Sequence, residues 1–409
     1  MRVAIIGGGL VGTCCGIHLM RGGAEVTIFD PEEDVGRASV AHVGSISIGS
    51  ILPLAGPGLV KQLIQSVSSA HGLMRIGLKR AVLAAPWLLE FLRQGQPDRV
   101  ARSIKALAPM MAKAFDSYAE LLAPSEYSDL FRREGQLHVY EDVQQFSKDE
   151  GGRRIRREHG INFEILQDEA LTGFEPRISP GFTHGVLYPD AGNITSPARL
   201  LDRLRCNYME LGGALARERV SYIQCGSDGR PAIRTRMQAL RQYDKLVIAA
   251  GAWSPSLAAM IGVHVPIESI RGYSVDFESS PLRLPTFFPG LKIFATPMEH
   301  GLRVSGIADI VGLRSNPDKR RAASVVFNAR RAIDGLDEKG GIPHMGHRPT
   351  TPDSVPIISR SRDHRNILLV AGHGQIGLMT AAISGQLAGD LLFDRPPVID
   401  PAPYRLDRF

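Results

Sequence analysis

The chain opens with a short apolar run at residues 3–6, followed at once by Gly7-Gly8-Gly9-Leu10-Val11-Gly12. These glycines begin a segment of helical composition at residues 10–21. A second apolar run at residues 25–29 then leads directly into Asp30. The order of strand, glycine-rich turn, helix and strand closed by an acid predicts a dinucleotide-binding unit at the start of an α/β fold.

Each glycine of this turn has a distinct predicted role. Gly7 permits the tight turn, Gly9 lets the backbone approach a diphosphate, and Gly12 allows the helix to pack closely on the strand. The amides at the helix N-terminus would donate to the phosphates. Asp30 stands where a carboxylate meets a ribose hydroxyl, and an acid at this place argues against the 2′-phosphate of NADP.

Apolar periodicity and turn residues predict the remaining elements. We expect strands at residues 135–140, 185–188, 245–250, 273–277, 292–296, 302–307 and 367–371. We expect helices at residues 100–122 and 197–211, and a last helix that runs from the turn at 372–374 to about Leu392.

The α/β signals lie at both ends of the chain and in its middle, which predicts a nucleotide-binding domain that is discontinuous in sequence. We expect this domain to consist of residues 1–90, 196–262 and 346–409, and a substrate-binding domain to consist of residues 91–195 and 263–345. A chain of 409 residues is long enough for two domains with a sizeable shared core.

The composition limits the partners of the chain. Lys and Arg number 48 against 42 Asp and Glu, a net charge of +6 without a long basic run. This small excess argues against nucleic acid as a partner and suits small anionic ligands. The four cysteines form no CxxC pair, and the Gly and Pro around His344 and His347 spoil a helical metal face, so we expect no metal site.

The sequence predicts no secretory or membrane-spanning segment. The first apolar run is too short for a signal peptide, and Gly and Pro interrupt the longest uncharged stretch, at residues 40–60. We therefore expect a cytoplasmic protein. A peripheral contact with the inner face of the membrane and formation of an oligomer stay open as alternatives.

Four further segments indicate which dinucleotide is bound. They are GRASVAHVG at residues 36–44, VIAAGAW at 247–253, GHRPTTPDSVPII at 346–358 and GHG at 372–374. Together they resemble the D-amino-acid oxidase superfamily of flavoproteins, most closely its bacterial D-amino-acid dehydrogenase branch, which includes D-hydroxyproline dehydrogenases. The resemblance covers essentially the whole chain. It implies a Rossmann-like FAD-binding domain and an antiparallel β-sheet substrate domain that covers the isoalloxazine ring.

The resemblance also assigns the residues that hold FAD. Beside the glycines and Asp30 of the first unit, it places residues at the adenine, the diphosphate and the flavin: Ser39, Ala41, Val220, Gly251, Gly374 and Gly377. Gly374 and Gly377 would open a helix whose positive end faces the flavin N1–C2=O side, where the reduced flavin carries negative charge. The sarcosine-oxidase branch carries a flavin-linking Cys where this chain has Gly346, so the resemblance implies non-covalent FAD.

Three residues are the candidates for contact with the substrate. The resemblance gives Arg348 a bidentate pair with the substrate carboxylate, for which the guanidinium fork is suited. Tyr273 would line the pocket, with its hydroxyl on the carboxylate or amine or else in the core, and His42 would contact substrate, tune the flavin or serve as an ordinary loop histidine. We expect His373 to be structural, and Leu291 to replace an aromatic pocket residue of the relatives.

The implied reaction is FAD-dependent oxidation of a D-amino or D-imino acid of the D-proline, D-hydroxyproline or D-alanine type, with transfer of the Cα hydride to flavin N5. The substrate would be a small carboxylate-bearing amine, and the electron acceptor a quinone, oxygen or a redox partner protein. A sarcosine- or glycine-type secondary-amine oxidase, a nicotinamide-dependent dehydrogenase and a flavin-binding subunit of a heteromeric dehydrogenase remain as alternatives.

Overall fold

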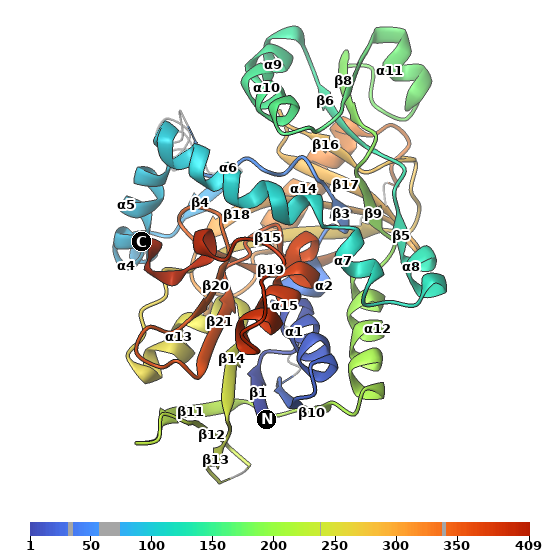
Figure 1. Cartoon of the computed structure of the whole chain (residues 1–409). Coiled ribbons are helices and arrows are strands. Elements are labelled where there is room, and N and C mark those ends of the chain that lie inside the picture. The colour runs from blue at the N-terminus through green and yellow to red at the C-terminus, as the bar shows by residue number, and fades with distance from the viewer. Residues whose placement is uncertain (32–35, 57–73, 238, 338–340) are drawn as a thin grey trace.

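The computed structural model describes residues 1–31, 36–56, 74–237, 239–337 and 341–409. Two large sheets dominate the described chain, and Figure 1 shows the strands of one mostly below those of the other. The first sheet is mostly parallel, and its strand β1 (Arg2–Ile6) leads directly into the glycine-rich turn, whereas the second sheet is mostly antiparallel. This mixed α/β architecture confirms the predicted fold class.

The parallel sheet has six strands in the order β10-β2-β1-β14-β21-β20. In that order the strands are Ala214–Ala216, Glu25–Phe29, Arg2–Ile6, Lys245–Ile248, Ile367–Ala371 and Ile357–Arg360. All neighbours are parallel except β20 and β21, which are antiparallel. The central strands are rich in Val, Ile and Leu and almost fully buried, as expected for a sheet covered on both faces.

Helices α1 (Leu10–Arg21) and α15 (Gly377–Leu392) pack closely together beside this sheet. Small residues make the approach possible, because a Cβ at Gly385 would lie 2.6 Å from the backbone carbonyl carbon of Cys14. Helix α12 (Pro197–Glu210) lies on the other side of α1, and the Ser196 hydroxyl accepts from the Arg199 amide at its start. These helices confirm the predictions at 10–21, 197–211 and the C-terminus.

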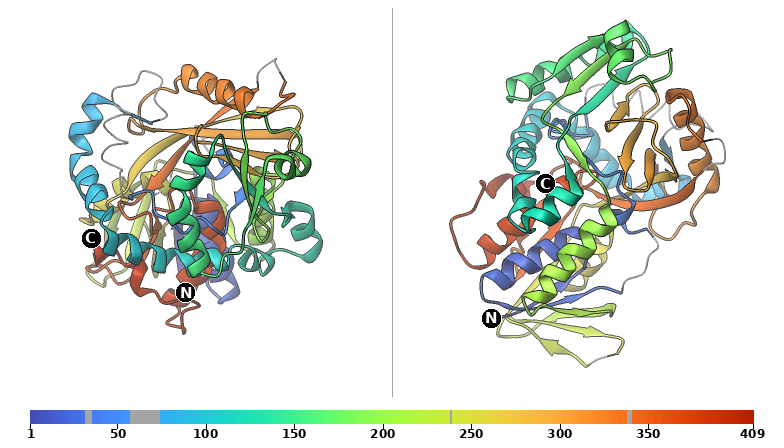
Figure 2. Two further views of the ribbon diagram at one scale, coloured as in Figure 1. Left: turned by 90° about the horizontal axis from the view of Figure 1, so that it is seen from above. Right: turned by 90° about the vertical axis from the view of Figure 1, so that its right-hand side faces the viewer.

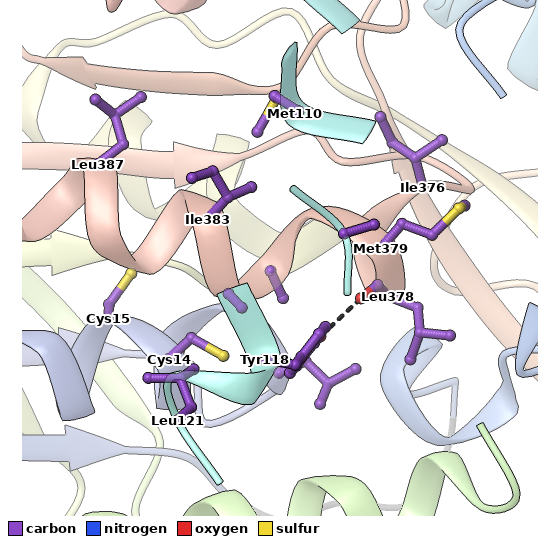
Figure 3. Close-up of a cluster of buried hydrophobic side chains, with 14 of the residues drawn as sticks. Cys14, Cys15, Met110, Tyr118, Leu121, Ile376, Leu378, Met379, Ile383 and Leu387 are labelled. Atoms are coloured by element: carbon purple, nitrogen blue, oxygen red, sulfur yellow. Dashed lines mark hydrogen bonds between the residues drawn. The ribbon is translucent and has the colours of Figure 1, made fainter. Parts of the chain in front are cut away.

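The predicted single helix at residues 100–122 is wrong in one respect, because the chain forms two helices there. Helix α6 (Pro97–Ala112) ends in tight turns in which Lys113 and Ala114 donate to carbonyls three residues back, and α7 (Asp116–Ala119) follows. The break redirects the chain so that the Tyr118 ring stays buried and its hydroxyl donates to the Leu378 carbonyl at 2.7 Å (Figure 3). Packing against α15 therefore overrides the helical period.

The second sheet has nine strands, in the order β19-β15-β18-β17-β16-β6-β8-β7, with β4 pairing β18. In that order, and then β4, the strands are Ile342–Thr350, Glu268–Phe277, Gly301–Ile310, Ile293–Met298, Thr286–Phe288, Gln136–Tyr140, His184–Tyr188, Glu164–Gln167 and Met74–Ile76. Only the β16–β6 and β18–β4 pairs are parallel. The predicted strands at residues 135–140, 185–188, 273–277, 292–296 and 302–307 all lie in this sheet.

The remaining described elements cover and extend the two sheets. Two small three-stranded sheets consist of β11 (Val220–Cys225), β12 (Pro231–Thr235) and β13 (Arg241–Gln242), and of β3 (Ser45–Ile46), β9 (Gly192–Ile194) and β5 (Phe131–Arg132). The other helices are α2 (Ala38–Ala41), α4 (Leu78–Leu83), α5 (Ala85–Gln94), α8 (Pro124–Leu130), α9 (Val143–Lys148), α10 (Glu150–Glu158), α11 (Asp168–Phe174), α13 (Ser254–Ala258) and α14 (Lys319–Ala332). Figure 2 shows the β11–β13 sheet at the end of the molecule opposite α9 and α10. In the part of the chain that the structure describes, no helix has the length and apolarity needed to cross a membrane.

The division into domains stays a prediction, but one strand spans a boundary and three further elements pack with the other domain. Strand β19 spans residue 346, and β4 pairs with the nine-stranded sheet although we assigned residues 1–90 to the nucleotide-binding domain. Helices α6 and α7 contact α15, so this part of residues 91–195 packs with the parallel sheet.

Candidate active site

A cleft of about 440 Å³ opens at the carboxyl ends of β1, β14 and β21, and we call it the nucleotide cleft. Gly7 has a φ of +107°, and a Cβ there would overlap the carbonyl oxygen of Ala249. A Cβ at Gly12 would overlap the carbonyl oxygen of Gly7, which lies in the turn itself. Both positions therefore require glycine, and they let the backbone form the floor of the cleft.

Asp30, the residue predicted to meet a ribose hydroxyl, lines the nucleotide cleft. Its Oδ2 accepts from the Gly8 amide at 2.6 Å, and its Oδ1 lies 3.4 Å from Nη2 of Arg37. That Nη2 is buried and has no hydrogen-bond partner among the described residues. An unsatisfied guanidinium nitrogen in a glycine-floored cleft fits a diphosphate, so these residues suit the FAD that the resemblance implies. Arg37 was missed as a site residue, although it stands in the GRASVAHVG segment.

Three further predicted cofactor residues line the nucleotide cleft: Ser39, Val220 and Gly251. The Ser39 hydroxyl accepts from the Leu10 amide at 3.2 Å, which joins α2 to the start of α1. Arg205 of α12 donates to the Gly8 carbonyl at 2.7 Å and so holds the glycine-rich turn in place. Sequence reasoning missed Arg205, because nothing in the local pattern connects α12 with the turn.

The start of α15 borders the same cleft. Gly374 and Gly377 both line it, but helix α15 begins at Gly377, and the Gly374 amide donates to the Pro349 carbonyl at 2.7 Å. The Met379 and Thr380 amides donate to the Ile376 carbonyl, so the Gly377 and Leu378 amides are the ones that the helix start leaves for a ligand. His373 also lines the cleft, and its Nε2 lies 3.0 Å from the Ser384 hydroxyl. Burial lowers the pKa of His373 to about 3, so it serves as a neutral structural residue.

A second cavity, of about 540 Å³, lies on the nine-stranded sheet, and we call it the inner cavity. It meets the nucleotide cleft at Ala38, His42 and Gly374, which line both. Strand β19 divides the two spaces, because side chains alternate along a strand. His347 and Pro349 line the cleft, whereas Gly346, Arg348 and Thr350 line the inner cavity.

Arg348 is held at the wall of the inner cavity without an ionic partner among the described residues. Its Nη1 donates to the Ile307 carbonyl at 3.0 Å, and its Nη2 lies 3.4 Å from the Ser305 hydroxyl. Gly272 on the neighbouring strand makes room for it, since a Cβ there would overlap the guanidinium group. Burial lowers the pKa of Arg348 to about 10, and the group remains a cation at neutral pH. No Asp or Glu is among the described residues that line the cavity.

Tyr273 also lines the inner cavity, but its hydroxyl accepts from the Asp318 amide at 3.1 Å, at the start of α14. The ring is 3% exposed and belongs to the core of the nine-stranded sheet. Of the two alternatives for this residue, the geometry favours a tyrosine whose hydroxyl serves the fold.

His42 stands where the two spaces meet, and both of its ring nitrogens are already used. Nε2 lies 3.0 Å from the Gln375 carbonyl, to which it donates, and Nδ1 accepts from the Gly44 amide at 3.0 Å. Burial, together with the nearby Arg348 and Arg303 cations, lowers the pKa of His42 to about 4. The ring is therefore neutral and both of its nitrogens have partners, so of the three alternatives for His42 the geometry favours an ordinary hydrogen-bonded loop histidine.

Ala41 lies on the inner cavity and not on the nucleotide cleft, in contrast to Ser39. It faces Gly346, where a Cβ would lie 3.2 Å from the Ala41 methyl and 3.3 Å from Cα of Ala38. A larger side chain at residue 346 would push α2 away. The described lining of both spaces also contains no cysteine.

The aromatic part of the inner cavity was missed by sequence reasoning. It comprises Phe287 and Phe294, which stack with ring centroids 5.6 Å apart, and beyond them Gln136, His138 and Arg156. Leu291, which we expected to replace an aromatic pocket residue, is buried in the core of the sheet and is not among the residues lining the cavity. The cavity therefore keeps an aromatic wall.

Comparisons with known proteins agree with this geometry. The family model described as "DAO: FAD dependent oxidoreductase" matches residues 2–391. A D-amino-acid oxidase from Bradyrhizobium diazoefficiens is 30% identical over 100% of this chain and 99% of its own length.

Solved structures share the fold. The glycine oxidase of Geobacillus kaustophilus aligns with a TM-score of 0.78 and 18% identity, over 100% of this chain and 99% of its own. The L-proline dehydrogenase of P. horikoshii aligns with a TM-score of 0.73 and 16% identity, over 100% of this chain and 93% of its own. The chain therefore belongs to the DAO family of FAD-dependent oxidoreductases.

Proposed function

We propose that this protein oxidises a D-amino or D-imino acid, of the D-proline, D-hydroxyproline or D-alanine type, with non-covalently bound FAD. One observation carries the proposal: the Arg348 guanidinium faces a cavity that joins the nucleotide cleft, and its described surroundings give it no carboxylate. A buried cation without an anionic partner is costly, and a carboxylate ligand relieves that cost. The substrate is therefore an amine that carries a carboxylate.

The residues of the chain contribute mainly by placing the substrate. FAD, when bound, supplies the acceptor for the two electrons that leave the substrate carbon and nitrogen. Arg348 holds the carboxylate through its fork, and this fixes the orientation of the Cα–H bond. Gly272 and Gly346 pair directly across β15 and β19 and leave the adjoining wall without side chains. The apolar walls exclude water from the reacting atoms.

The amine reacts in its neutral form, so the reaction needs no strong base from the protein. His42 and His138 both line the inner cavity, and burial holds the pKa of each well below its usual range. Neither ring is poised to exchange a proton near neutral pH. The substrate loses its ammonium proton to solvent, and the imine product hydrolyses or, for a cyclic amine, stays a pyrroline.

Two further observations bear on the configuration and the size of the substrate. The relative that is 30% identical over the whole chain carries the name D-amino-acid oxidase, which supports a D substrate. The inner cavity, at about 540 Å³, is much larger than glycine needs, which speaks against a glycine-type oxidase. Gly346 and its close neighbours support non-covalent FAD, because they leave no room for a linking cysteine.

The test is anaerobic loss of flavin absorbance with D- and L-forms of alanine and proline, D-hydroxyproline, glycine and sarcosine. We expect the D-forms to bleach the flavin of the isolated chain, and the proposal fails if sarcosine or an L-amino acid is preferred. If no amine bleaches the isolated chain, it acts as a subunit of a larger dehydrogenase. Oxygen, a quinone and an electron-accepting protein, added to the reduced enzyme, identify the acceptor.

The variant Arg348→Lys tests the carboxylate clamp. It keeps the charge but loses the planar fork, so we expect the KM of the best substrate to rise roughly tenfold, as for loss of one charge-assisted hydrogen bond. The dissociation constant of FAD should stay unchanged and serves as the control. An unchanged KM would contradict the assignment of Arg348.

A further inference from the structure

The inner cavity extends well beyond the reach of Arg348, along one row of paired residues. Ser305 pairs with Phe294, Phe294 with Phe287, and Phe287 with His138 in the register of four neighbouring strands. Residues that pair directly share one face of the sheet. Three strand spacings separate Ser305 from His138, a span of about 14 Å. Arg348 touches Ser305, so the row connects Arg348 with the far end of the cavity.

The middle of this row is apolar and the far end is polar. Phe287 stacks on Phe294 and meets the His138 ring edge-on, with centroids 5.2 Å apart. Beyond the aromatic rings lie Gln136, His138 and Arg156, which we call the distal pole. An alkyl chain suits the rings, and a group that accepts hydrogen bonds suits the distal pole.

Hydrogen bonds determine which ring nitrogen of His138 carries the proton in the distal pole. Gln136 is fully buried, and its Oε1 accepts from the Ser45 hydroxyl at 3.2 Å. Its Nε2 must therefore donate to Nε2 of His138, 2.7 Å away. The proton of the neutral ring then sits on Nδ1, which makes that nitrogen a donor. Burial and the Arg156 cation hold the pKa of His138 well below its usual range.

Arg156 gives the distal pole its positive charge. It is 9% exposed, its Nε donates to the Gly49 carbonyl at 3.1 Å, and its Nη1 lies 3.4 Å from Asp149. The same carboxylate also faces Arg153 at 3.9 Å and accepts from the Tyr140 hydroxyl at 2.7 Å. Two cations thus share one carboxylate, and a net positive charge remains.

The charged side chains along the whole inner cavity also favour an anionic ligand. The charged side chains among its described lining residues are Arg156, Lys292 and Arg348, all cations. One substrate carboxylate at Arg348 leaves Lys292 without a counter-charge in the described cavity lining, and Arg156 with only a share of the Asp149 carboxylate. We propose that Arg156 and His138 form a second anion-binding site, and that the preferred substrate is an amino acid of the D-alanine type with an extended side chain that ends in a carboxylate or similar anionic group. This inference rests on the proposed function, because it takes Arg348 as the site of the α-carboxylate.

The first test compares D-2-aminoadipate with D-norleucine, whose side chains have similar length and differ in the terminal charge. We expect kcat/KM to favour D-2-aminoadipate by about tenfold or more, the range of one charge-assisted hydrogen bond. Arg156→Met should abolish this preference, whereas Arg154→Met should keep it, since the exposed Arg154 lies on the same helix, faces Glu158 and does not line the cavity. Equal use of both substrates by the wild-type enzyme overturns the inference and leaves the proposed function intact.

A second readout needs neither turnover nor a variant. The dissociation constants of straight-chain dicarboxylates, from glutarate to suberate, are measured by calorimetry on the FAD-loaded enzyme beside monocarboxylates of equal length. We expect dicarboxylates of suitable length to bind about tenfold tighter, because they occupy both poles. Equal affinity of both series at every length contradicts a second anion site, even if no amino acid is oxidised. Arg156→Lys should restore part of the preference that Arg156→Met loses.

Discussion

The nucleotide cleft and the inner cavity share strand β19, yet they are built by different means. The cleft is floored by the backbone of the glycine-rich turn, in which a side chain at Gly7 or Gly12 would overlap a carbonyl oxygen. The inner cavity is walled by side chains that several strands of one sheet bring together. A backbone floor tolerates almost no substitution, whereas side-chain walls can be changed one at a time. We therefore propose that the first region binds the cofactor and that the second selects the substrate.

The largest effect should come from breaking the backbone floor. In Gly12→Ala the new methyl would overlap the Gly7 carbonyl, which cannot move without opening the turn. We expect almost no FAD in the purified protein and a loss of stability at or above the usual overpacking cost of about 1–3 kcal/mol. Flavin content and the thermal midpoint measure this. Gly173→Ala is the control, because nothing lies near a Cβ there, and equal FAD content in both variants would contradict the account.

A smaller effect is expected where a side chain of the inner cavity must move. In Gly272→Ala the methyl would overlap the end of the Arg348 side chain, which can shift without unfolding the sheet. We expect the KM of the best substrate to rise, up to about 100-fold for a displacement near 1 Å, with FAD content unchanged.

Tyr273→Phe is the matched control on the same strand. It removes the hydroxyl that accepts from the Asp318 amide, so the free energy of unfolding should fall by about 1 kcal/mol while the KM stays the same. A KM that rises in Tyr273→Phe as much as in Gly272→Ala would restore the hydroxyl as a substrate contact.

A substitution of Arg37 tests whether a side chain contributes to FAD binding beside the backbone of the nucleotide cleft. Its buried Nη2 has no hydrogen-bond partner among the described residues, and a diphosphate oxygen would satisfy it. We expect Arg37→Met to weaken FAD binding about tenfold, as loss of one charge-assisted hydrogen bond does. Titration of the apoprotein with FAD measures the dissociation constant. Arg21→Met, at the far end of α1, should leave it unchanged.

A separate effect concerns the pH dependence of stability, through histidines buried beside the two regions. Burial lowers the pKa of His42 and of His347 to about 4, below the value near 6.5 of an unfolded chain. Below pH 6.5 the unfolded chain therefore binds protons that the folded chain excludes. The free energy of unfolding should fall from about pH 6.5 to pH 4, by up to roughly 1.4 kcal/mol per pH unit for each histidine.

Denaturant unfolding at several pH values checks this slope. His42→Gln should make it shallower, because it removes one buried group that titrates. His159→Gln, at the exposed end of α10, should leave it unchanged. An identical slope for the wild type and His42→Gln would show that His42 is not held neutral by the fold.

The two regions also differ in how far they could be predicted from the sequence. The strand, turn, helix and Asp30 of the nucleotide cleft follow one another within thirty residues, so local pattern was sufficient. Arg348 came from a resemblance and not from spacing. The distal pole was not predictable, because the register of the nine-stranded sheet places Phe287 beside His138, far apart in sequence. The helix break after Ala112 likewise depends on packing against α15.

The most direct measurement determines two dissociation constants, for FAD and for a carboxylate substrate analogue, in both Arg37→Met and Arg348→Met. The account predicts that the first variant loses affinity for FAD alone and the second loses affinity for the carboxylate alone. If Arg348→Met binds the carboxylate as tightly as the wild type does, the inner cavity is not the place where the substrate carboxylate binds.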